Sequence, residues 1–114
     1  MIHVSAPSRY KVNKKLIRQI GDEYLVARNT PGVTVNVVFV GKRKMREIAS
    51  TYKNEDVALP VLAFTFKEKI ENESLLGEVI LCYPQSVLLA AERNKDVDTM
   101  LRQLIEHGIN NLLL

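Results

Sequence analysis

The chain has 114 residues, of which 46% are hydrophobic and 25% charged, and its formal net charge is +3 at pH 7. This length predicts one domain over residues 1–114 with a single core, because it is too short for two ordinary domains. A membrane-spanning protein is excluded, since no apolar run approaches the roughly 20 residues that cross a bilayer, and residues 1–10 lack the features of a signal peptide. The single cysteine, Cys82, excludes an internal disulfide and suits a cytoplasmic location.

Two strands and two helices are predicted in the first half of the chain. A short edge strand is expected at residues 2–4, followed by an amphipathic helix over about residues 13–28. Val33–Val40 is rich in β-branched residues and too short for a core helix, which predicts a buried strand. A second helix follows Gly41. Its apolar face is formed by Met45, Ile48, Ala49 and Tyr52.

Two further strands and a short helix are predicted after residue 60. Strands are expected at residues 61–66 and 76–82, joined by a polar, hairpin-like connection over residues 67–74. Pro84 suits the first turn of a helix that runs to about residue 94, because proline lacks an N–H that a first turn would leave unpaired. The apolar stripe expected on this helix is Val87, Leu88, Ala91 and Ala90.

A last helix is predicted to begin after Asp96, whose carboxylate can accept hydrogen bonds from the first turn. Its apolar residues lie along one side from Val97 to Leu113. The element order is therefore β-α-β-α-β-β-α-α. This order predicts an α+β fold in which helices cover a four-stranded mixed sheet.

Positive charge is concentrated in the first half of the chain. Residues 1–53 carry eleven Lys and Arg against three acids, whereas the remainder carries five against ten. Such a segregated basic surface can attract a polyanion such as RNA, although the same residues could simply solvate exposed helix faces. The basic charge in the first turn of the second predicted helix is unfavourable toward the helix dipole, which prefers acidic residues at an N-terminus. This mismatch favours a functional reason for the charge. The basic residues are Lys42, Arg43, Lys44 and Arg46.

Three stretches, in order along the chain, match the motifs of one known family. Residues 52–65 lie without a gap against Y-R-x-K-D-x-P-T-D-V-L-S-F-P, and the matches are Tyr52, Asp56, Val61, Leu62 and Phe64. Residues 76–82 (Leu-Gly-Glu-Val-Ile-Leu-Cys) lie against L-G-D-I-V-I-C-P, and residues 107–114 against H-G-x-x-H-x-x-G-Y-D-H. The chain thus resembles the YbeY family of rRNA-maturation endoribonucleases over nearly its whole length.

This resemblance implies a zinc-like divalent ion, held by three histidines, that activates a water molecule for phosphodiester cleavage. His107 matches the first histidine and Asn111 stands at the second, where an amide oxygen is a much poorer ligand than imidazole. The third position lies past Leu114. The residues present therefore cannot form the three-histidine site, and a longer natural chain would restore only the third ligand. The alternative for His107 is a partly buried helix histidine that contacts the backbone or the Glu106 side.

The resemblance also implies RNA-contacting residues. The family's arginine is replaced by Lys53, which keeps the charge but loses bidentate geometry toward phosphate. If RNA is cleaved, we expect His107 to act as metal ligand or acid/base group and Lys53 to stabilise phosphate charge. Contacts to RNA are expected from Lys42, Arg43, Lys44, Arg46 and Lys53.

The sequence therefore suggests three alternative functions. The first is a YbeY-like endoribonuclease homologue that acts on ribosomal RNA or the small ribosomal subunit. The second is a non-catalytic RNA- or ribosome-binding module on the same fold, because Pro60 and Ala63 also replace polar residues of the family motif. The third is an interaction protein that docks through the apolar residues 112–114. The oligomeric state stays open.

Overall fold

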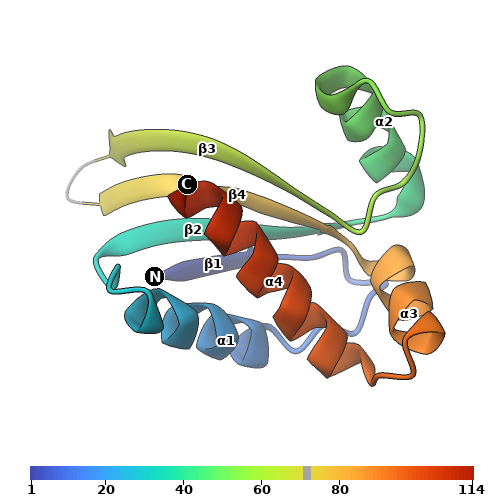
Figure 1. Cartoon of the computed structure of the whole chain (residues 1–114), viewed down its shortest axis with the longest axis horizontal. Helices are drawn as coiled ribbons and strands as arrows, with labels where there is room; N and C mark the ends of the chain where they lie inside the picture. Colours follow the sequence, from blue (N-terminus) through green and yellow to red (C-terminus); the bar gives the residue numbers. More distant parts are fainter. Residues whose placement is uncertain (71–72) are drawn as a thin grey trace.

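The structure is a computed structural model that describes residues 1–70 and 73–114, with the side chains of residues 1–66 and 74–114. Within these residues the elements are β1 (Ile2–Ser5), α1 (Lys14–Ala27), β2 (Val33–Val40), α2 (Lys42–Lys53), β3 (Val61–Ile70), β4 (Glu73–Cys82), α3 (Tyr83–Glu92) and α4 (Val97–Leu113). The predicted order is confirmed (Figure 1). In this described part of the chain, no helix combines the length and the apolar character needed to cross a bilayer.

The strands form one mixed sheet in the order β1-β2-β4-β3. β1 pairs with β2 and β2 with β4 in parallel, whereas β3 pairs with β4 in the antiparallel sense. On the central strand β4, the consecutive residues 79–82 are all buried, as expected where a strand is covered on both sides. The predicted α+β fold, with its mixed sheet and its edge strand at the N-terminus, is therefore confirmed.

The β3–β4 hairpin is longer than predicted. β3 continues to Ile70 and β4 begins at Glu73, and these two residues pair across the hairpin. The polar connection predicted over residues 67–74 was wrong, because charged residues are typical of loops but also occur on edge strands such as β3. Residues 71–72 of that connection lie outside the described residues.

The two faces of the sheet are covered by different helices. Residues that alternate along a strand point to opposite faces, and on β4 Val79 and Leu81 pack into the cluster that contains α1 and α4, whereas Ile80 and Cys82 pack into the cluster that contains α2. Figure 1 shows α1 and α4 lying across the sheet and α2 standing apart from them near the start of β3. α1, α3 and α4 therefore cover one face, and α2 covers only part of the other.

α4 lies unusually close to the sheet. A Cβ atom on Gly108 would lie 2.6 Å from Val79 Cγ1, so the helix could not sit at this height with a larger residue there. Asn110 of α4 also accepts hydrogen bonds from Tyr24 Oη, at 2.8 Å, and from Arg28 Nη1. These contacts fix α4 against both β4 and α1.

α3 buries only one residue of the stripe that was predicted for it. Ala90 is buried as predicted, but Val87, Leu88 and Ala91 are exposed, and the polar Ser86 is buried instead. The Ser86 hydroxyl donates to the Cys82 carbonyl at 2.9 Å, which satisfies a buried polar group within one turn. The prediction was wrong for the other three residues because apolar residues occur on more than one side of this short helix, so spacing alone does not identify the covered side.

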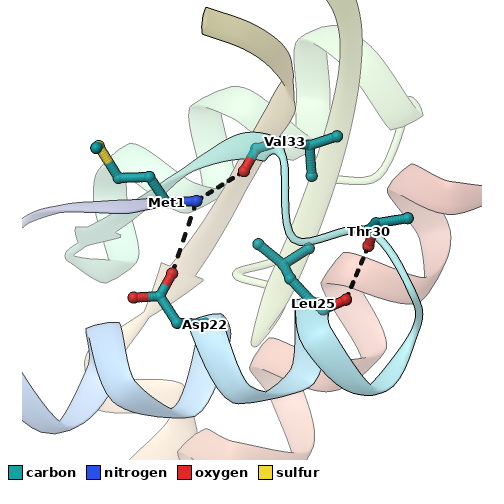
Figure 2. A network of polar contacts seen from close by, with 5 residues as sticks. All are labelled: Met1, Asp22, Leu25, Thr30 and Val33. Atoms are coloured by element: carbon teal, nitrogen blue, oxygen red, sulfur yellow. Dashed lines mark hydrogen bonds and ion pairs between the residues drawn. The ribbon is translucent and has the colours of Figure 1, made fainter.

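The N-terminus is fixed beside the turn that connects α1 to β2 (Figure 2). The Met1 ammonium donates to the Val33 carbonyl at 2.7 Å and lies 3.7 Å from the Asp22 carboxylate. Thr30 Oγ1 donates to the Leu25 carbonyl at 3.1 Å and closes the turn. These contacts align β1 with β2 at the edge of the sheet.

Candidate nucleic-acid interface

The N-terminus of α2 presents backbone and side-chain positive charge together. Gly41 is the N-cap residue, and because glycine has no side chain it provides no capping hydrogen bond to the first turn. The unpaired N–H groups of a first turn carry partial positive charge, and the side chains of Lys42, Arg43 and Lys44 are exposed around them. This end of α2 is therefore suited to anions.

A cationic cleft opens between α2, the loop before β3 and the start of α3. Its volume is about 520 Å³, and it is lined by Lys42, Arg43, Arg46, Val57, Ala58 and Gln85. Gln85 Nε2 donates to the Ala58 carbonyl at 2.8 Å, which holds the loop against α3. Arg46 Nε lies 3.5 Å from the exposed Asp56 carboxylate, which orients the guanidinium along the same loop. Three of the predicted RNA-binding residues thus share one cleft.

A second, shallower cleft of about 340 Å³ adjoins it on the other side of the α2 N-terminus. Its lining includes Lys42, Arg43 and Lys44 and adds Arg9 and Tyr10, which the sequence analysis had not selected. The Arg9 guanidinium lies 4.8 Å from the centroid of the Tyr10 ring, which stacks on Tyr83 at 5.1 Å. Arg9 is distant from α2 in sequence, so only the folded chain brings it to this site.

Lys53 is not brought into either cleft. It is the last residue of α2 and is exposed, and the 11 residues that separate it from Lys42 correspond to about 16 Å along a helix axis. A role for Lys53 would therefore require a ligand that extends along α2 beyond the cationic cleft.

His107 lies on α4 in a separate cleft of about 350 Å³, whose lining includes Arg93, Gln103, Pro60 and Leu89. His107 is exposed, so the expectation of a partly buried histidine was wrong. Its Nε2 lies 3.4 Å from Nδ2 of Asn111, one helical turn away. Arg93 was not selected from the sequence, because its proximity to His107 arises only from the packing of α3 against α4.

The residues present do not fit the zinc-like ion that the family resemblance implied. Within residues 1–70 and 73–114, no group of three or more His, Cys, Asp or Glu side chains could hold a metal ion. His107 has an amide neighbour in place of a second imidazole. The Cys82 thiol is buried in the α2 cluster, and burial raises its pKa, which disfavours the thiolate that binds metals.

A smaller cleft of about 200 Å³ connects the surroundings of the two sites. It shares Ala58 and Gln85 with the cationic cleft and Pro60 and Leu89 with the His107 cleft. A single extended ligand that follows the loop before β3 could therefore contact both the cations of α2 and the imidazole of α4.

Comparison with known proteins identifies the family. Residues 3–113 match the family model described as Endoribonuclease YbeY. The chain belongs to the YbeY family. Among its relatives, the Endoribonuclease YbeY of Aquifex aeolicus is 28% identical over 103 residues, which cover 90% of this chain and 69% of that protein. The Endoribonuclease YbeY of Azoarcus sp. is 34% identical over 83 residues, which cover 68% of this chain.

The matches differ in how much of each relative they cover. The chain spans only 33% of the length of the Azoarcus relative and 57% of an Endoribonuclease YbeY from Thermodesulfovibrio yellowstonii. The solution structure of TM1509 from Thermotoga maritima superposes with a TM-score of 0.67 at 24% identity, over 98% of this chain and 71% of that one. This similarity supports the same fold.

Proposed function

We propose that this chain is a YbeY-like endoribonuclease homologue that binds ribosomal RNA and acts in rRNA processing and maturation of the small ribosomal subunit, which would place it in the cytoplasm. The observation that carries the proposal is the cationic cleft, where Lys42, Arg43 and Arg46 surround about 520 Å³. That volume lies in the range of ordinary ligand sites, and its cations suit phosphate groups. The name shared by the relatives supports endoribonuclease chemistry.

His107 is the residue that we assign to proton transfer if the chain cleaves RNA. Imidazole is the side chain used most often for acid–base chemistry near neutral pH, and His107 is exposed to a ligand in its cleft. Arg93 lines the same cleft and offers a planar guanidinium for bidentate contact with a phosphodiester. Lys53 would contact phosphate farther along α2.

A second function, binding without cleavage, is favoured by one specific observation. Asn111 pairs with His107 at the position where the family motif has a second histidine, and the described residues do not supply a metal-binding group. In this case the chain would be an RNA- or ribosome-binding module that uses the same cationic cleft. The two functions predict the same binding surface and differ only at His107.

Binding is tested by the salt dependence of affinity for single-stranded rRNA fragments. Each phosphate contact to single-stranded nucleic acid contributes about 0.7 to the slope of log K against log salt. We expect the double variant Lys42→Gln/Arg43→Gln to reduce the slope by about 1.4 and to weaken binding at low salt. Arg102→Gln, which removes an exposed cation of α4, is the matched control and should leave the slope unchanged. An unchanged slope in the double variant would show that RNA binds elsewhere.

Cleavage is tested on the same fragments with wild-type protein, His107→Ala and His107→Gln. Loss of cleavage in both variants, with binding retained, would support proton transfer by His107. Binding without cleavage by the wild type, with or without added divalent ions, would support the second function. Cleavage that persists in both variants would refute the assignment of His107.

A further inference from the structure

A groove on the face of the sheet that carries α2 is lined by aromatic side chains. Three residues of α2, one turn apart, form one wall: Lys44, Ile48 and Tyr52. Alternate residues of β3 and β4 form the floor and the other wall: Phe64, Phe66, Glu78 and Ile80. This aromatic groove encloses about 360 Å³. It exists because α2 covers only the start of β3 and leaves the rest of that face open.

The rings of the aromatic groove remain available to a ligand. Tyr52 is 67% exposed and Phe66 is 43% exposed, which is unusual for large aromatic residues. Tyr52 meets the partly buried Phe64 edge to face, with centroids 5.2 Å apart and planes at 70°, so its orientation is supported from below. The groove therefore presents a positioned ring with most of its surface uncovered.

The charges around the aromatic groove favour a base inside and phosphates outside. Lys44 lines both this groove and the shallow cleft with Arg9 and Arg43, so the groove continues the basic surface of α2. Glu78 is half-buried and lines the groove beside Phe64, with which it pairs across the strands. A carboxylate repels phosphate but accepts hydrogen bonds from the N–H groups of bases.

We propose that the aromatic groove is a stacking subsite for an unpaired base of single-stranded RNA, with Tyr52 and Phe66 as the stacking residues and Lys44 as the contact to the adjacent phosphate. The inference rests on the proposed function, because it requires that RNA reach the basic surface of α2. Exposed rings beside a line of cations are the common design of single-strand sites, where any base can stack and phosphates supply the salt dependence. The subsite would keep the bound RNA single-stranded along α2.

The test uses short single-stranded RNA that contains the fluorescent base 2-aminopurine, together with an RNA of the same length that carries an abasic site at that position. Stacking on Tyr52 should quench 2-aminopurine in the wild-type complex. Tyr52→Leu and Phe66→Leu keep apolar side chains at exposed positions but remove the rings, so the fold should persist. Val26→Ala, at a 60% exposed residue of α1, is the matched control.

We expect Tyr52→Leu to lose the quenching and to bind the intact RNA roughly tenfold more weakly, whereas it and the wild type should bind abasic RNA equally well. The slope of log K against log salt should stay unchanged, since no phosphate contact is removed. RNA binding with a normal salt slope but equal affinities of wild type and Tyr52→Leu would overturn the stacking subsite alone. No salt-dependent RNA binding by the wild type would refute the proposed function itself.

Discussion

The two faces of the sheet differ in how completely they are covered. Ile105 and Ile109 of α4 and Ile17 and Ile20 of α1 are at most 1% exposed against one face. On the other face α2 buries Met45 and Ala49, but large side chains remain exposed beside it. The first face thus provides most of the core, whereas the second carries a small core together with a ligand-accessible groove.

The difference between the two faces predicts where substitutions should affect stability and where they should affect binding. Stability depends on apolar area removed from water and on the absence of cavities, and both are concentrated under α1 and α4. The cations and exposed rings cluster on α2 and next to it, where they contribute little to folding. Function and fold can therefore be separated by testing the two faces with matched variants.

The largest expected loss of stability comes from a substitution in the face that α1 and α4 cover. Ile105 is fully buried, so Ile105→Ala should lower the free energy of unfolding by about 2–5 kcal/mol. Phe66→Ala on the open face should cost only about 1 kcal/mol, because the ring is already 43% exposed. Urea unfolding followed by circular dichroism measures both. Equal losses of unfolding free energy in the two variants would contradict the difference in coverage between the two faces.

Most of the fold could be predicted because periodicity and caps are local. β2 was predicted with its exact bounds, and the caps at Asn13 and Asp96 accept hydrogen bonds from Leu16 N and Thr99 N as expected from residues of this type. The covered side of α3 could not be predicted. Its burial depends on which neighbouring elements it meets, and the buried residues are Ala90 and the polar Ser86 rather than the apolar Leu88.

Of the candidate site, only the basic residues along α2 could be predicted from the sequence. Lys42, Arg43 and Arg46 are close in sequence, so their joint position followed from the helix itself. Arg9 and Arg93 come from distant elements and join their clefts only through packing. The aromatic groove was also missed, because Tyr52 resembled an ordinary core residue of α2 in the sequence pattern.

A smaller change in stability is expected on the exposed side of α4, which carries His107 and Asn111. Asn111→His would place two imidazoles one helical turn apart, a spacing that can hold zinc. We expect zinc to raise the melting temperature of this variant. At a zinc concentration one hundred times Kd, binding should add about 2.7 kcal/mol to the free energy of unfolding. The wild type and the double variant His107→Ala/Asn111→His should show no such shift. A comparable shift in the wild type would show that the existing residues do hold an ion.

The smallest effect concerns the first turn of the same helix. The backbone N–H of Thr99 donates to Asp96 at 2.7 Å, and this bond lowers the pKa of the Asp96 carboxyl. Because the folded pKa lies below the unfolded one, ionised Asp96 stabilises the fold above about pH 4, and this contribution is lost as the pH falls further. Asp96→Asn keeps a capping oxygen without the charge. Melting temperatures should therefore be slightly lower for Asp96→Asn than for the wild type at pH 7 and converge toward pH 3, and a constant difference over that range would contradict the role of the charge.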